Sequence, residues 1–257
     1  MILDEIVATT RRQLEARKAK HTLAELDCMC VNQSPPRDAL ASLSRQGMNL
    51  IAEVKRASPS KGLLAPDLDA AILARIYEKS GASAISVLTE PEYFKGSLND
   101  LQEVQLTVNV PLLRKDFIVD PYQVWEARAY GADLVLLIAA AIPMGELARL
   151  YQAIIDLAMT PLIEVHNRLE LEQVLELEPK VIGINNRNLS DFSVSLATTL
   201  ELRSLIPSDT IVISESGIHT REDVKRLEEA QVNAILVGEA LVTSPDPAVT
   251  ISELLGR

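Results

Sequence analysis

The stretch NLIAEVKRASPSKG, residues 49–62, begins as a buried strand and ends as a polar loop. Side chains two apart on a strand share a face, so Ile51, Glu53 and Lys55 project to the same side. A carboxylate and an ammonium therefore follow an apolar residue on one face of a strand that is otherwise apolar. This order predicts that the strand carries charged groups to a site at its C-terminal end.

Similar apolar runs recur along the rest of the chain. They are SAISVL (83–88), VPLLRK (110–115), DLVLLI (133–138), PLIEV (161–165), VIGIN (181–185), TIVIS (210–214) and NAILVG (233–238). Near-continuous Val, Ile and Leu runs are typical of parallel strands that are buried on both faces. Amphipathic stretches such as DLDAAILARIYEKSGA (67–82) and TREDVKRLEEAQ (220–231) lie between them and predict helices.

Eight successive strand–helix units of about 25 residues predict an α/β fold, a single (β/α)₈ barrel. A doubly wound open sheet is the alternative, but the chain has no G-x-G-x-x-G and no P-loop motif, which disfavours it. Residues 1–48 do not follow this alternation of strand and helix segments, and they predict a helical N-terminal extension packed on the barrel. We expect one domain over residues 1–257.

Composition limits the classes of partner. The chain has 25 basic and 36 acidic residues, a net charge of −11, which disfavours binding to nucleic acid or to an anionic membrane. Its richest apolar run, LVLLIAAAI, has nine residues against the roughly 20 that span a bilayer. Cys28 and Cys30 lie in a loop-like stretch and are interpreted as free thiols of a reducing compartment. With no signal-peptide pattern at the N-terminus, we expect a cytoplasmic protein.

Charged or amide groups end four further strands in the same way. On each of these strands the inward face begins with an apolar residue or glycine and carries a polar residue towards its C-terminal end. The residues that share a face are Leu113, Lys115 and Phe117; Leu162 and Glu164; Gly183, Asn185 and Arg187; and Ile211, Ile213 and Glu215. Any one of these groups could be a structural ion pair or a rim charge. Together they predict a shared site at the C-terminal ends of the barrel strands. Lysines and glutamates there would shift one another's pKa values, as acid–base chemistry needs.

Weaker signals suggest what this site binds. Gly217 and Gly238 follow the last two strands, where barrels often bind phosphate through backbone N–H groups. The loop RASPSKG could close over such a ligand as a lid, and Phe94 could cover a ring. His166 follows Glu164 by two residues, but no third ligand has matching placement, so we predict no metal site.

Several segments together resemble the indole-3-glycerol phosphate synthase family, essentially over the whole chain. The motifs are IAEVKRASPSKG, VLTEPEYFKGSLNDL, PLLRKDFIVDPYQV, PLIEVH, IGINNRNL, ISESGI and ILVGEAL. The resemblance implies a (β/α)₈ barrel with no metal or organic cofactor. It implies a carboxy-lyase of tryptophan biosynthesis that converts 1-(2-carboxyphenylamino)-1-deoxyribulose 5-phosphate to indole-3-glycerol phosphate, carbon dioxide and water.

The resemblance also implies roles for particular residues. Lys115 would protonate the ketone, and Lys55 would bind anions and donate a proton in the dehydration. Glu164 would stabilise the cationic intermediate and act as base. Attack on the ketone needs a proton donor near neutral pH, and a lysine whose pKa is lowered by a neighbouring cation or by burial can serve. The orienting groups would be Glu53, Asn185 and Glu215; the anthranilate carboxylate would meet Ser58 and Arg187; the ring pocket would be Phe94, Phe117, Leu136, Ile138 and Leu189; and the phosphate site would be Ser216, Gly217, Gly238 and Glu239.

Two positions depart from the family pattern. Glu239 stands where many relatives carry a hydroxyl residue, so backbone donors would hold the phosphate there. Ala39 stands where an aromatic residue is frequent, which would loosen the packing of the extension. Two other functions are compatible with a barrel carrying these lysines, a Schiff-base aldolase or phosphosugar isomerase and a non-catalytic phosphosugar-binding protein. We expect a small phosphorylated substrate, and a monomer with weak homo-oligomerisation as the alternative.

Overall fold

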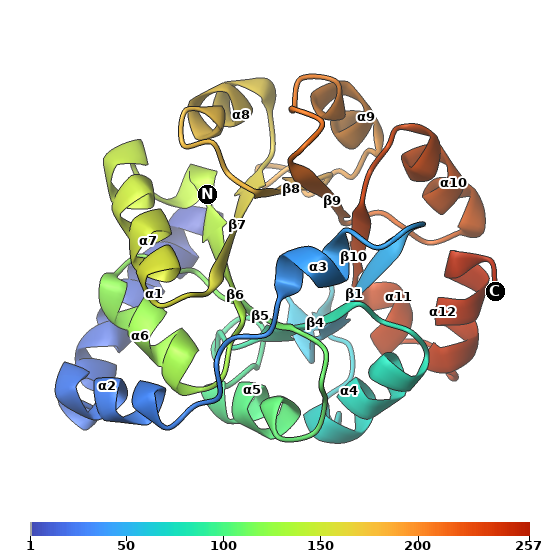
Figure 1. Cartoon of the computed structure of the whole chain (residues 1–257). Coiled ribbons are helices and arrows are strands. Elements are labelled where there is room, and N and C mark those ends of the chain that lie inside the picture. Colours follow the sequence, from blue (N-terminus) through green and yellow to red (C-terminus); the bar gives the residue numbers. More distant parts are fainter. Residues whose placement is uncertain (1) are drawn as a thin grey trace.

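The structure, a computed structural model, describes residues 2–257. Eight parallel strands form a closed barrel in which β1 is hydrogen-bonded to both β4 and β10 (Figure 1). The strands are β1 (Asn49–Val54), β4 (Ala84–Leu88), β5 (Leu112–Lys115), β6 (Leu134–Ile138), β7 (Thr160–Val165), β8 (Val181–Asn185), β9 (Ile211–Glu215) and β10 (Ala234–Val237). Each predicted apolar run overlaps one of these strands, so the predicted (β/α)₈ barrel is confirmed.

Helices follow the strands around the outside of the barrel. They are α4 (Ala70–Lys79), α5 (Leu98–Gln105), α6 (Pro121–Ala129), α7 (Met144–Asp156), α8 (Arg168–Leu175), α9 (Ala197–Arg203), α10 (Arg221–Glu229), α11 (Glu239–Val242) and α12 (Pro247–Leu255), with a 3₁₀ turn η1 (Ala139–Ala141) after β6. Side chains that accept a first-turn backbone N–H explain where many begin; they belong to Asp69, Ser97, Asp120, Asn167, Thr220 and Asp246. None of the described helices is both long enough and apolar enough to cross a membrane.

Alternate strand residues face two separate apolar cores. Ile51 points into the barrel, where it packs in a cluster with Leu113 and Ile213. Its neighbours Leu50 and Ala52 belong to the larger core between the strands and the helices. The barrel interior is therefore filled with aliphatic side chains, and polar side chains are left to the strand ends.

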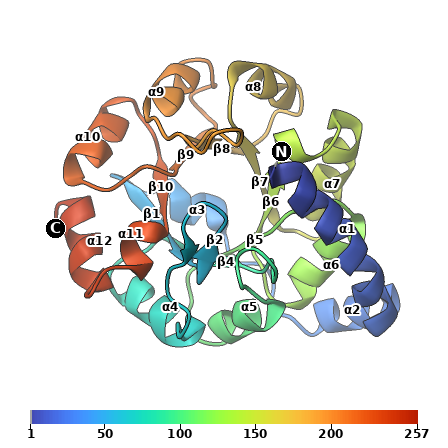
Figure 2. The same ribbon diagram turned by 180° about the vertical axis from the view of Figure 1, so that it is seen from behind.

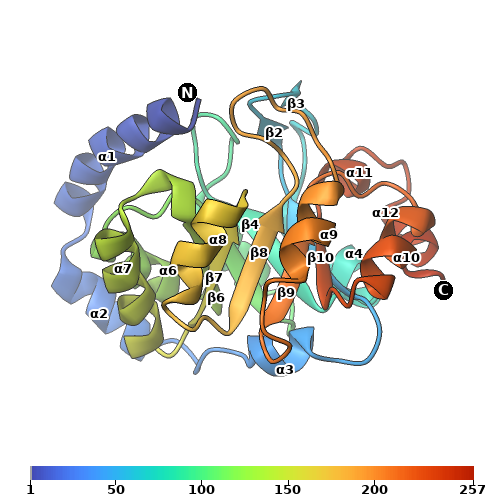
Figure 3. The ribbon, with the colours of Figure 1, turned by 90° about the horizontal axis from the view of Figure 1, so that it is seen from above.

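The extension before β1 contains three helices, α1 (Ile2–Lys20), α2 (Leu23–Val31) and α3 (Ala39–Leu43). α3 closes the N-terminal end of the barrel, because Ala39 and Leu43 join the interior cluster and Ser42 donates a 2.6 Å hydrogen bond to the carbonyl of Ser83. The prediction of a loop-like stretch around Cys28 and Cys30 was wrong, since both lie in α2. Figure 3 shows α3 at one end of the barrel and the hairpin of β2 (Ala57–Ser58) and β3 (Gly62–Leu63) at the other.

α1 lies on the outside of the barrel beside α6 and α7 (Figure 2). Its Arg17 donates from Nε to Glu126 of α6 at 2.9 Å, and Glu126 Oε2 lies 3.5 Å from the fully buried Arg114 of β5. Arg114 Nη2 is in turn 2.7 Å from Asp116 Oδ2. Removing one member of a buried ion pair leaves an uncompensated charge, so this chain of contacts fixes α1 to the strand that carries Lys115.

Candidate active site

A cavity opens at the C-terminal ends of the strands, beneath the β2–β3 hairpin. Every barrel strand, or the residues that directly follow it, contributes to its lining, and α1 adds its first turns. All of the site residues that the sequence nominated line this one cavity: Glu53, Lys55, Ser58, Phe94, Lys115, Phe117, Leu136, Ile138, Glu164, Asn185, Arg187, Leu189, Glu215, Ser216, Gly217, Gly238 and Glu239. The topology of the barrel thus brings together groups that are far apart along the chain.

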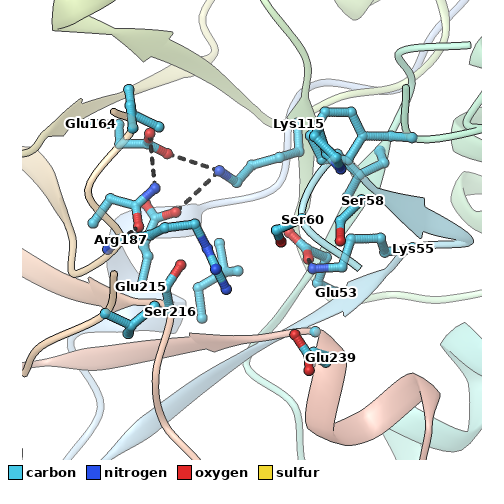
Figure 4. Close-up of a pocket in the computed structure, with 18 of the residues that line it drawn as sticks. Glu53, Lys55, Ser58, Ser60, Lys115, Glu164, Arg187, Glu215, Ser216 and Glu239 are labelled. Atoms are coloured by element: carbon cyan, nitrogen blue, oxygen red, sulfur yellow. Dashed lines mark hydrogen bonds and ion pairs between the residues drawn. The ribbon is translucent and has the colours of Figure 1, made fainter. Parts of the chain in front are cut away.

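The ammonium of Lys115 lies between two buried carboxylates (Figure 4). Its Nζ is 2.8 Å from Glu164 Oε2 and 3.1 Å from Glu215 Oε2. Asn185 Nδ2 donates to the other oxygen of Glu164 at 3.1 Å. Glu164 and Glu215 are each 2% exposed, so both carboxylates depend on these partners for compensation of their charge.

The carboxylates reverse the pKa shift expected for Lys115. Burial alone lowers its pKa, but the negative charges of Glu164, Glu215 and Glu53 outweigh burial and raise it above the usual lysine value. The expectation of a lowered lysine pKa was therefore wrong, because burial here brings acidic neighbours with it. Lys115 keeps its proton at neutral pH and is a charged hydrogen-bond donor.

The two carboxyl groups beside Lys115 differ in their proton affinity. Burial raises the pKa of Glu164, but Lys115 and His166 outweigh it and hold that pKa well below the usual range. Burial and the charge of Glu164 raise the pKa of Glu215 to about 7. Near neutral pH the site thus combines a cationic donor, an ionised carboxylate and a carboxyl group that can gain or lose a proton.

Lys55 forms a second ion pair at the opposite side of the cavity, with its Nζ 2.6 Å from Glu53 Oε1. Glycines leave room for the carboxylates of both ion pairs. A Cβ atom on Gly238 would lie 2.2 Å from Glu53 Oε1, and one on Gly183 would lie 2.3 Å from Glu215 Oε1. Gly238 thus has a packing role that the sequence did not indicate.

The substitution Gly183→Ala tests whether the placement of Glu215 matters. The new methyl group would displace the Glu215 carboxylate from Lys115, so we expect kcat to fall about tenfold or more and stability to fall by about 1–3 kcal/mol. Gly145→Ala in α7 is the matched control, because a Cβ there meets nothing within 4 Å. Steady-state kinetics and thermal unfolding of both variants measure the effects; wild-type kcat in Gly183→Ala would contradict the prediction.

The end of the cavity near β9 and β10 is built from turns and backbone amides. Ser216 and Gly217 have φ of 67° and 77°, so the chain turns sharply after β9 in a region that favours glycine. Gly238 directly precedes α11. Lys61 at the hairpin turn lies 3.5 Å from Glu239 Oε1, which links the hairpin to a residue that departs from the family pattern.

The opposite end of the cavity is apolar. The rings of Phe94 and Phe117 have centroids 6.0 Å apart and are tilted by 39°. The loop that carries Phe94 is fixed by Glu90, whose carboxylate is 1% exposed and accepts backbone hydrogen bonds from residues 92, 93 and 94 at 2.6–3.0 Å. The sequence did not nominate Glu90. Its only sequence signal is a carboxylate two residues after a buried strand.

The sequence also missed the contribution of α1. Ile2, Leu3 and Ile6 line the cavity, as do Phe192 and Val194 from the loop after β8. The spacing of the three α1 residues places them on one helical face, which is a signal of a buried surface. It does not tell which part of the barrel that face covers.

Comparisons with known proteins agree with this geometry. The family model for indole-3-glycerol phosphate synthase matches residues 3–254. An indole-3-glycerol phosphate synthase from Dehalococcoides mccartyi is 49% identical over 259 residues, covering 99% of this chain and 100% of the relative. One from Kineococcus radiotolerans is 47% identical, covering 99% of this chain and 94% of the relative. A solved 3-hexulose-6-phosphate synthase from Salmonella typhimurium has a TM-score of 0.66 at 12% identity, covering 81% of this chain and 97% of that chain, which shows a shared barrel fold alone.

Proposed function

The chain belongs to the indole-3-glycerol phosphate synthase family, and we propose that it closes the indole ring with the groups gathered around Lys115. The substrate is 1-(2-carboxyphenylamino)-1-deoxyribulose 5-phosphate, and the products are indole-3-glycerol phosphate, carbon dioxide and water. The observation that supports these residues is the meeting of Lys115 with Glu164 and Glu215, opposite the Glu53–Lys55 pair, in one cavity.

Lys115 is the general acid of the ring closure. The ring carbon that bears the carboxylate attacks the ketone carbon, and Lys115 donates its proton to the ketone oxygen as the carbonyl bond breaks. Its raised pKa is compatible with this role, because an alkoxide is a much stronger base than an amine. The carboxylate then leaves as carbon dioxide, and its bonding electrons restore the ring.

The later dehydration uses the groups on both sides of the cavity. Lys55 protonates the departing hydroxyl group, which leaves as water, and Glu164 accepts the proton released as the indole forms. The ionised Glu164 also stabilises the cationic intermediate. Glu53, Asn185 and Glu215 orient these groups through the contacts of 2.6, 3.1 and 3.1 Å that they make with Lys55, Glu164 and Lys115.

The two ends of the cavity fix the ends of a flexible substrate, which promotes ring closure. The phosphate is held by Ser216 and by backbone N–H groups near Gly217 and Gly238, with Glu239 engaged by Lys61 instead of contacting the anion. Ser58 and Arg187 hold the anthranilate carboxylate. The ring lies among Phe94, Phe117, Leu136, Ile138 and Leu189.

The wider organisation follows from the same observations. We propose one domain over residues 1–257, with residues 1–48 as its extension, because Arg17–Glu126 and Arg37–Asp133 ion pairs join the extension to the barrel. We propose a monomer, because one chain supplies groups for every proposed step. The free thiols of Cys28 and Cys30 support a cytoplasmic location, and the net charge of −11 argues against a nucleic-acid partner. Side chains supply each proton donor and acceptor, so the proposed chemistry uses no metal or organic cofactor.

Incubation of the protein with the carboxyphenylamino substrate tests the proposal. We expect indole fluorescence to appear and carbon dioxide to be released in equal amounts. Sodium borohydride added during turnover should trap no covalent lysine adduct. A trapped adduct would indicate Schiff-base chemistry, and phosphate-ligand binding without turnover would indicate a binding protein; either result would overturn the proposal.

A further inference from the structure

His166 lies beside Glu164 but is not one of the residues that line the cavity. It follows β7 directly and is two residues after Glu164, so strand alternation puts both side chains on the same side. His166 Nε2 is 3.1 Å from Glu164 Oε1, and its Nδ1 is 3.1 Å from Glu170 Oε2. The side chain is 8% exposed and does not line the cavity. His166 therefore contacts a residue of the site without itself lining the cavity.

The second carboxylate of this arrangement is fixed by the start of α8. Asn167 caps that helix, because the N–H of Glu170 donates to Asn167 Oδ1 at 3.0 Å. Asn167 Nδ2 donates back to Glu170 Oε1 at 2.5 Å, and the backbone N–H of His166 donates to Glu170 Oε2 at 2.8 Å. Glu170 is thus a rigid acceptor that fixes the orientation of the imidazole ring.

We infer that His166 is a positioning residue for Glu164, holding Oε1 of that carboxylate together with Asn185 so that Oε2 faces Lys115. The geometry divides the carboxylate into two sides. Asn185 and His166 lie 3.1 Å from Oε1, and Lys115 lies 2.8 Å from Oε2. This inference rests on the proposed function, because it assigns a support to the base of that reaction.

The charges around Glu164 favour this role. Burial lowers the pKa of His166, but the carboxylates of Glu164 and Glu170 beside its ring outweigh burial and raise that pKa to about 10. Three ionisable groups face Glu164: His166 from the end of the same strand, Lys115 from β5 and Glu215 from β9. One further carboxylate, that of Glu170 in α8, faces His166. With His166 as an imidazolium, a proton near this cluster binds to Glu215 and leaves Glu164 ionised.

The variants His166→Gln and Glu170→Gln test the inference. In His166→Gln, glutamine removes the positive charge beside Glu164. In Glu170→Gln, glutamine keeps a hydrogen-bond acceptor for the His166 ring and leaves the Asn167 cap of α8 in place, but it removes the negative charge next to the imidazolium. We expect kcat to fall about tenfold in His166→Gln, with KM changed by less than about twofold because the ring does not touch the cavity. The acidic limb of the pH profile of kcat should move up by about one pH unit, because Glu164 loses an opposite charge. Glu170→Gln should lower kcat by less and leave the acidic limb close to its wild-type position, because His166 keeps its proton there.

Glu172→Gln is the matched control, since Glu172 lies on the same helix and pairs with Arg168 at a largely exposed surface. It should keep the wild-type pH profile. If His166→Gln and Glu170→Gln both fold, as judged by circular dichroism, yet keep that profile and kcat, the inference is wrong.

An NMR measurement is independent of turnover. The chain has three histidines, and His21 and His219 supply comparison signals in the imidazole ¹⁵N spectrum. The signals lost in His166→Gln assign the ring, which should remain an imidazolium through pH 8 in the wild type. A neutral His166 ring at pH 7 would overturn the inference. A wild-type protein that does not turn over the substrate would instead overturn the proposed function. The NMR spectrum would still report the protonation state of His166 in that case.

Discussion

Lys115→Ala should lower kcat by about 10²–10⁴-fold, because it removes the group that donates a proton to the ketone. KM should change much less, since the proton transfer develops in the transition state and the substrate is held mainly at its phosphate and ring ends. Steady-state kinetics followed by indole fluorescence measure both quantities. Lys115→Met, which retains most of the aliphatic chain, should lose as much activity as the alanine variant.

Two controls separate catalysis from folding. Lys180→Ala removes an exposed lysine directly before β8, at the end of the barrel away from the cavity, and should leave kcat unchanged. Loss of Lys115 leaves Glu164 and Glu215 facing each other, but Glu215, with a pKa of about 7, can take up a proton and relieve the repulsion. We therefore expect a folded variant. Turnover within about threefold of wild type in Lys115→Ala would remove this residue from the mechanism.

The barrel could be predicted from the sequence because its signal is local and repeated. Strands buried on both faces need continuous apolar runs, and each run here is followed by an amphipathic segment that often carries a capping residue. The prediction of a loop-like stretch around Cys28 and Cys30 is wrong, because α2 forms there. A capping box of Thr22 and Glu25 marks its start, with the Glu25 N–H donating to Thr22 Oγ1 at 3.2 Å. The spacing of Thr22 and Glu25 in the sequence therefore indicates a helix start at this point.

The membership of the cavity could also be predicted, because strand alternation and barrel closure determine which side chains converge. Ile51, Glu53 and Lys55 illustrate the rule: the first is in the interior cluster, and the other two meet at the cavity. The contributions of Ile2 and Leu3 could not be predicted in this way. They depend on where α1 docks, and that depends on a buried contact between Arg17 and Glu126 across 109 residues of sequence.

The protonation states of the site lie beyond sequence patterns. The sign of the Lys115 pKa shift depends on two distances of 2.8 and 3.1 Å to carboxylates, and on burial that a sequence does not give. The difference between Glu164 and Glu215 has the same origin. Lys115 touches both carboxylates, but His166 lies beside Glu164 only. Two chemically identical side chains thus differ because of a neighbour that touches only one of them.

That difference predicts unequal effects of Glu164→Gln and Glu215→Gln. Glutamine resembles a neutral carboxyl group in shape and charge. Glu215, with a pKa of about 7, is already partly neutral near neutral pH, so glutamine is a fair substitute for it. The pKa of Glu164 is held well below the usual range, so glutamine replaces a group that is ionised before the reaction and removes the proposed base. We expect kcat to fall by about 10²-fold or more in Glu164→Gln and by less than about tenfold in Glu215→Gln.

Measuring both variants across the pH range tests the assignment directly. Each carboxylate makes one ion pair with Lys115, at 2.8 Å for Glu164 and 3.1 Å for Glu215, so loss of an ion pair alone would affect the two variants similarly. If Glu164 accepts the proton, kcat should fall more in Glu164→Gln than in Glu215→Gln at every pH. The smaller fall of kcat in Glu215→Gln should grow above pH 7. An equal or larger loss in Glu215→Gln would transfer the role of base to Glu215, because no difference in contact with Lys115 would then explain it.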